Sequence, residues 1–201
     1  MEEKRPGQYY DITETDKGTY ILNANDMCMA PFLDKMIEAG VDSIKIEGRA
    51  KSEYYVAVTA NAYRGALDSL KSSDGNWQLP DWVGEELNKI SHRTYSTGFY
   101  LGAPSNAQTY ENAGYIRDYN VAAVVTGYEN GYVTAILKNK FGVGTELDCL
   151  EAGHSPFKIQ VDTLLDGGNN VIDCANSPMS VIKIPYPREI KAGSMLRMKT
   201  G

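Results

Sequence analysis

Apolar residues in the first half of the chain recur with helical spacing. Residues 31–40 (PFLDKMIEAG) predict a helix that ends at Gly40, since glycine is favoured just beyond a helix C-terminus. The apolar face of this helix comprises Phe32, Leu33, Met36 and Ile37. A second helix is predicted from Ser52, a suitable N-cap residue, to about Leu70.

Two short apolar runs, residues 19–22 and 41–48, predict β-strands that precede the two helices. The order of strand, helix, strand, helix is typical of parallel strands joined by right-handed crossovers. Eight such units close a β/α barrel of the TIM type, so two units cannot form one alone. We therefore predict that residues 1–110 are the C-terminal part of a β/α barrel, which a further segment or another chain completes.

The second half has a different pattern, with short β-rich runs separated by turn residues. Glu129, Asn130 and Gly131 lie between two apolar runs, and Asn and Gly tolerate the positive φ that a tight hairpin requires. Regular short strands with glycine-rich turns indicate a small all-β barrel or sandwich over residues 115–201. The predicted fold class is thus α/β plus all-β, a terminal βαβα part of a TIM-like barrel followed by a small C-terminal β-barrel.

Composition and charge argue against a membrane span and against an autonomous RNA-binding module. Of the 201 residues 42% are hydrophobic, and no run of about 18 apolar residues occurs, so we expect a cytoplasmic protein without a membrane span. Three cysteines at wide spacing fit a reducing compartment. Residues 1–114 carry 11 Lys and Arg against 17 Asp and Glu, and residues 115–201 carry 9 of each. Because neither half is broadly basic, an autonomous RNA-binding module is not expected.

Charged residues alternate with isoleucines in the run SIKIEGRAKS. In a strand, Ile44 and Ile46 would lie on one face and Lys45 and Glu47 on the other. In a barrel this places Lys45 and Glu47 inside, near the C-terminal mouth where active sites lie, with Arg49 at the rim. The alternative is a buried ion pair between Lys45 and Glu47 that serves architecture only, with Arg49 solvated.

Two further segments carry candidate chemistry. Cys28 follows a predicted strand end, beside Asn23, Asn25 and Asp26, although a lone cysteine is more often a packed apolar residue than a ligand or nucleophile. In SHRTYSTGFYLG, polar and aromatic side chains gather: His92, Arg93, Tyr95 and Tyr100. This segment either contacts a ligand or connects the two domains through its aromatic residues. His154, in a turn, is expected at the surface, and the common hydrolase motifs are missing from the sequence.

Four long segments carry a resemblance to a known family. The run YILNANDMCMAPFLDKMIEAGVDSIKIEGRAKSEYYVAVTANAYRGAL resembles the signature end of peptidase family U32, the collagenase-like proteases. SHRTYSTGFYLG resembles the family's next block. KNKFGVGTELDCLEAG and PYPREIKAGSMLRM are similar to its C-terminal β-domain. The resemblance covers nearly the whole chain.

The resemblance implies a cofactor. Members of the family carry an N-terminal barrel region that supplies most of a four-iron four-sulfur site, and Cys28 resembles the last of its four cysteine ligands. The other three ligands would lie upstream, so no cluster is expected on this chain alone. Cys149 and Cys174 match no such motif and are expected to be packing residues of the β-domain.

The resemblance also implies several activities. Some members are described as collagen-degrading peptidases, whereas others resemble factors that hydroxylate tRNA uridine, with prephenate involved, or ubiquinone. We expect an iron-sulfur-dependent tRNA uridine hydroxylation factor, inactive as this chain alone and completed by the missing N-terminal barrel region. The alternatives are a peptidase that depends on Glu47 or His92, and a non-enzymatic β-barrel that binds RNA or protein.

Roles follow for the remaining candidates under this hypothesis. Lys45 and Arg49 would neutralise a carboxylate-bearing cosubstrate such as prephenate, and Glu47 would orient Lys45 or move a proton. His92 is a further catalytic candidate. The substrate, tRNA or a peptide, is expected to contact Asn23, Asn25, Lys51 and Arg93. An incomplete barrel exposes apolar faces, so an oligomer is possible.

Overall fold

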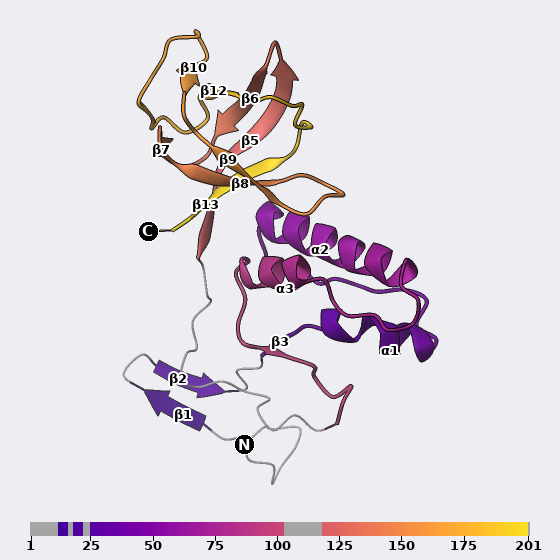
Figure 1. The fold of residues 1–201 in the computed structure, drawn as a ribbon. Helices are drawn as coiled ribbons and strands as arrows, with labels where there is room; N and C mark the ends of the chain where they lie inside the picture. The colour runs from indigo at the N-terminus through magenta and orange to yellow at the C-terminus, as the bar shows by residue number, and fades with distance from the viewer. Residues whose placement is uncertain (1–11, 16–17, 22–24, 103–117, 201) are drawn as a thin grey trace.

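The computed structural model of the protein describes residues 12–15, 18–21, 25–102 and 118–200. A helical part formed by residues 25–102 lies beside a curled β-sheet formed by residues 118–200 (Figure 1). The predicted boundary at residues 110–115 falls outside the described residues.

The described residues of the first half form short strands and three α-helices. Its elements are β1 (Ile12–Thr15), β2 (Gly18–Ile21), β3 (Asp26–Met27), the 3-10 helix η1 (Ala30–Phe32), α1 (Leu33–Glu38), α2 (Glu53–Lys71), α3 (Asp81–Asn88) and β4 (Tyr95–Ser96). The core between the helices consists of Ala30, Leu33, Val58, Ala62, Ala66, Val83, Leu87 and Ile90, together with Leu150 from the second half.

Both predicted helices are confirmed. Gly40 follows α1 with a φ of 85°, in the left-handed region that favours glycine. The hydroxyl of Ser52 accepts a hydrogen bond from the backbone N–H of Tyr55 at 3.3 Å, as expected of an N-cap. The predicted apolar face of the first helix is only partly buried, because Leu33 is fully covered whereas Ile37 is 49% exposed.

The predicted pairing of the first strands is wrong. β2 covers most of residues 19–22, but it pairs antiparallel with β1 because a two-residue connection brings β1 beside it. Residues 41–48 form no strand, because a strand requires a hydrogen-bonded neighbour and no described residue pairs with them. The parallel pair is instead β3 with β4, which the helices connect. That residues 1–110 belong to a β/α barrel therefore stays a prediction.

The second half is all-β, as predicted. Its elements are β5 (Tyr119–Glu129), β6 (Tyr132–Leu137), β7 (Phe141–Gly142), β8 (Glu146–Leu150), β9 (Phe157–Gln160), β10 (Leu165–Asp166), β11 (Cys174–Ala175), β12 (Val181–Pro185) and β13 (Met195–Lys199). Seven of them form one antiparallel sheet in the order β10, β12, β6, β5, β13, β8, β9. The sheet curls into a half-barrel (Figure 1), where a small barrel or sandwich was predicted, and it stays open because its end strands β10 and β9 do not pair with each other.

Details of this sheet confirm several expectations. Asn130 and Gly131, with φ of 51° and 83°, form the tight turn between β5 and β6. Cys149 is fully buried in the sheet core, where burial raises the pKa of its thiol to about 12, so it acts as a packing residue. Cys174 is half-buried on β11, and His154 is exposed. None of the helices in the described ranges is both long and apolar enough to cross a membrane.

Candidate functional site

A cavity of about 280 Å³ opens where β3 and β4 end. Because these strands are parallel, their carboxyl ends lie at the same edge, the edge at which β/α folds commonly hold ligands. The cavity is lined by Cys28, Pro31, Phe32, Leu79, Gly84, Leu87, Asn88, Tyr95, Ser96 and Thr97. The lining is mostly apolar, with one thiol and a few hydroxyl and amide groups.

Cys28 is held in this cavity by its backbone and by one phenol. Its N–H donates to the carbonyl of Ser96 at 2.9 Å, which extends the pairing of β3 with β4. Its Sγ lies 3.9 Å from the hydroxyl of Tyr63 on α2. Burial, and to a smaller extent the nearby Cys28, raises the pKa of Tyr63 above its ordinary value. Burial also raises the pKa of Tyr95. Both phenols are therefore neutral at physiological pH.

A charged group lies beside the cavity, around Asp26. The carboxylate Oδ2 of Asp26 accepts a hydrogen bond from the backbone N–H of Arg93 at 3.1 Å and lies 3.6 Å from Nζ of Lys51. Lys51 also donates to the carbonyl of Ser91 at 2.9 Å. Asp26 thus brings together two predicted substrate-binding residues from segments about 40 positions apart, and it precedes Cys28 by two residues.

Asp26 and Tyr63 were not chosen as site residues from the sequence. Asp26 stands next to the motif around Cys28, so its position was a usable signal. Tyr63 is one of several tyrosines on α2 and nothing local distinguishes it. Of the two predicted asparagines, Asn25 is half-buried and adjoins Asp26, whereas Asn23 lies outside the described residues.

His92 is buried, with 5% of its surface exposed. Its ring stacks on that of Tyr95, with centroids 4.2 Å apart and planes inclined by 4°. Its Nδ1 donates to the carbonyl of Arg93 at 2.6 Å, because a carbonyl can only accept. His92 is not among the residues that line the cavity. This geometry favours the structural interpretation, in which His92 supports the cavity wall through Tyr95, while Tyr100 is exposed.

Lys45, Glu47 and Arg49 lie on the exposed segment that follows α1. Nζ of Lys45 is 3.7 Å from Oε2 of Glu47, and the two side chains are 85% and 70% exposed. The backbone N–H of Arg49 donates to Oε1 of Glu47 at 3.1 Å. Lys45 and Glu47 therefore do not point inward as expected, because residues 41–48 do not form a strand. The buried ion pair is not formed either, and an exposed pair of this kind contributes little stability.

An iron-sulfur cluster would find one suitable ligand here. Cys28 offers a thiol at the cavity, whereas Cys149 lies in the sheet core and Cys174 lies on β11. Within the part of the chain that the structure describes, no three His, Cys, Asp or Glu residues come together as a metal site. The described residues therefore fit a single cluster ligand and not a complete set.

Comparison with known proteins finds relatives that match most of this chain. tRNA hydroxylation protein P1 of Bacillus subtilis is 28% identical over 203 residues, covering 94% of this chain and 48% of that protein. tRNA hydroxylation protein P of Escherichia coli is 29% identical over 201 residues, covering 98% of this chain and 44% of that protein. An uncharacterized protease of Methanocaldococcus jannaschii is 33% identical over 142 residues, covering 68% of this chain and 33% of that protein.

The chain spans about half the length of the two tRNA hydroxylation proteins it matches. The sequence model of peptidase family U32 matches residues 1–110, and that of the peptidase family U32 C-terminal domain matches residues 117–197. The chain therefore belongs to peptidase family U32.

Proposed function

We propose that this chain is the C-terminal part of a tRNA hydroxylation protein and that Cys28 supplies one ligand of its four-iron four-sulfur cluster. The observation that carries the proposal is the setting of Cys28, a half-buried thiol in an apolar cavity whose neighbouring phenols are neutral. Thiolate is the usual protein ligand of such clusters, and the mostly apolar lining of the cavity suits one.

The same setting argues against Cys28 as a protease nucleophile. A catalytic thiol requires a base within hydrogen-bond reach that is itself oriented by a third group. Among the described residues the side chain that contacts the sulfur is Tyr63, whose raised pKa makes it a poor base at neutral pH. The imidazole of His92 stacks on Tyr95 and binds a backbone carbonyl.

Two relatives named for tRNA hydroxylation match nearly the full length of this chain, and about half of each lies beyond the match. We propose that the remaining cluster ligands come from the corresponding half of the complete protein that contains this chain. When bound, the cluster would supply a redox-active or Lewis-acidic iron. The residues of this chain would hold it through Cys28, exclude water through the apolar cavity wall and place charged groups nearby.

Lys51 and Arg93 are proposed substrate contacts, and both interact with Asp26, which precedes Cys28 by two residues. Asp26 holds the ammonium of Lys51 and the backbone of Arg93, so the position of the Lys51 side chain is set before a substrate arrives. Lys45 and Arg49 remain candidates for binding a carboxylate-bearing cosubstrate such as prephenate, with Glu47 as the group that orients Lys45. Because these side chains are exposed, we propose that another part of the complete protein covers them.

The proposal is tested with the complete protein that contains this chain, expressed in a bacterial strain that lacks its own tRNA hydroxylation proteins. Nucleoside mass spectrometry of the tRNA is expected to detect hydroxylated uridine, and the purified protein is expected not to cleave gelatin. Gelatin cleavage without hydroxylated uridine would establish the peptidase instead. Tight tRNA binding by residues 118–200 without either activity would indicate a binding module.

A further inference from the structure

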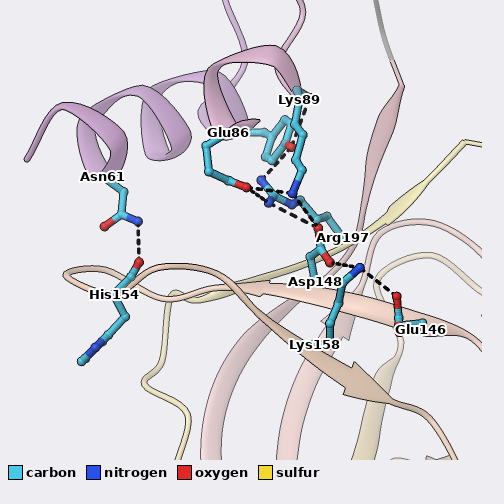
Figure 2. A network of polar contacts seen from close by, with 9 residues as sticks. Asn61, Glu86, Lys89, Glu146, Asp148, His154, Lys158 and Arg197 are labelled. Atoms are coloured by element: carbon cyan, nitrogen blue, oxygen red, sulfur yellow. Dashed lines mark hydrogen bonds and ion pairs between the residues drawn. The ribbon is translucent and has the colours of Figure 1, made fainter. Parts of the chain in front are cut away.

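The two halves of the molecule meet through buried charges (Figure 2). Arg197 on β13 is fully buried, and its Nη2 donates to Oε1 of Glu86 on α3 at 2.5 Å. The same nitrogen lies 3.4 Å from Oδ2 of Asp148 on β8. Nη1 donates to the hydroxyl of Tyr54 on α2 at 3.0 Å. One guanidinium of the sheet therefore contacts both long helices of the first half.

Other cations complete this group. Nζ of Lys89 lies 3.0 Å from Oε1 of Glu86 and 3.3 Å from Oδ2 of Asp148. Lys158 lies 2.7 Å from Oδ1 of Asp148, on the opposite side of that carboxylate. The two buried carboxylates are thus matched by cations, which limits the free-energy cost of removing the charges from water. Removal of one member would leave a buried charge without its partner.

Helix α3 stands between this charged group and the cavity. Glu86 faces Arg197, whereas Gly84, Leu87 and Asn88 of the same helix line the cavity beside Cys28. The carbonyl of Leu87 accepts a hydrogen bond from Tyr95 at 2.6 Å. One wall of the cavity is therefore a helix whose other side is attached to the C-terminal sheet.

Tyr54 extends the attachment to the end of α3. Its hydroxyl accepts from Arg197 and donates to the carbonyl of Lys89, the residue that follows the helix, at 3.3 Å. Burial, opposed by the charge of Arg197, raises the pKa of Tyr54 to about 12, so the hydroxyl keeps its proton and its donor role. Arg197 thus reaches α3 by two routes, directly through Glu86 and through Tyr54.

We propose that Arg197 is a positioning residue, which fixes α3 as the wall of the Cys28 cavity and so transmits the placement of the C-terminal sheet to that site. The coupling is a property of the cavity and does not rest on the proposed tRNA reaction. The second half of the chain then has a role beyond its own fold, because it holds in place a helix that lines the cavity beside the thiol.

The test measures how fast Cys28 reacts in the folded 201-residue chain. Wild-type and variant proteins are treated with iodoacetamide, and the peptides that contain each cysteine are quantified by mass spectrometry. Arg197→Met is expected to raise the alkylation rate of Cys28 about tenfold. This change follows if the arrangement with α3 in place beside Cys28 becomes less stable by about 1.4 kcal/mol. Glu86→Gln keeps the side-chain shape and is expected to raise the rate in the same direction. Arg197→Lys, which keeps the charge but not the planar fork, is expected to restore part of the protection.

Two controls separate positioning from general loss of structure. Cys149, buried in the sheet core, is expected to stay unreactive in every variant. Asn61→Ala removes another contact between the halves, in which Asn61 donates to the carbonyl of His154 and accepts from the N–H of Gly153, both at 2.9 Å. Neither of these hydrogen bonds involves α3, so Cys28 is expected to react as in the wild type. An unchanged Cys28 rate in Glu86→Gln and Arg197→Met, or a parallel rise at Cys28 and Cys149, would overturn the proposal.

Discussion

The sulfur of Cys28 lies 3.9 Å from the hydroxyl oxygen of Tyr63, a residue 35 positions further along the chain. This contact joins the segment after β3 to the middle of α2. It gives the thiol a neutral neighbour, because burial keeps Tyr63 protonated. The proposed role of Cys28 as a ligand, and not as a nucleophile, depends on this environment.

Two tyrosines near the cavity are expected to differ in their contribution to stability. Tyr63→Phe removes a long contact to sulfur and the interaction of the hydroxyl with the backbone at Met29 and Ala30, and should change the free energy of unfolding by less than about 1 kcal/mol. Tyr95→Phe leaves the buried carbonyl of Leu87 without the donor it has at 2.6 Å, and should cost about 1–3 kcal/mol. Urea denaturation of the two variants measures the difference. Equal losses would show that the Tyr95 bond does not hold the cavity wall.

The helix glycines Gly65 and Gly84 form a matched pair. A Cβ at Gly65 on α2 would overlap the indole ring of Trp82, a residue of α3. Gly65→Ala is therefore expected to destabilise the protein by about 1–3 kcal/mol and to alter tryptophan fluorescence. A Cβ at Gly84 meets nothing within 4 Å, so Gly84→Ala should be neutral or stabilise by up to about 1 kcal/mol. Thermal unfolding of both variants tests the packing of α3 on α2.

The charged group at Arg197 predicts how stability depends on pH. Burial alone would raise the pKa of Asp148, but the hydrogen bond from Lys158 and the charges of Lys89 and Arg197 hold it below its usual value. An aspartate in the unfolded chain has a pKa of about 3.9. The pKa of Asp148 in the folded protein is lower than this value. The carboxylate therefore contributes stability above that pH, and the contribution is lost as pH falls through the folded value.

Asp148→Asn should accordingly be less stable than the wild type at pH 7, by about 1–3 kcal/mol, because Arg197 and Lys89 lose one charged partner but keep Glu86. The difference should narrow as the pH is lowered below about 4, because the wild-type carboxylate is then protonated. Urea denaturation between pH 3 and 7 measures both. A difference that stays constant across this range would mean that Asp148 is not ionised in the folded protein.

Local patterns in the sequence predicted the elements whose determinants are local. Ser52 caps α2 through its own hydroxyl, and the turn at Asn130 and Gly131 needs only residues that tolerate positive φ. The alternation of Ile44, Lys45, Ile46 and Glu47 was locally as good a strand signal. It failed because a strand also depends on a partner elsewhere, and residues 41–48 have none among the described residues.

The site was predictable in part for the same reason. Cys28, Lys51 and Arg93 were chosen from the sequence, and the structure brings them to the surroundings of one cavity through Asp26 and Tyr63. Arg197 was not identified, since in the sequence it is one charge in a closing strand. Its importance comes from Glu86 and Asp148, which lie 111 and 49 positions away.

We propose that Cys28 takes part in tRNA hydroxylation by the complete protein. The decisive measurement is hydroxylated uridine, quantified by nucleoside mass spectrometry in tRNA from cells that express the complete wild-type protein, Cys28→Ser or the matched control Cys174→Ser. We expect hydroxylated uridine with the wild type and with Cys174→Ser, and its loss with Cys28→Ser. Undiminished hydroxylation by Cys28→Ser would contradict it.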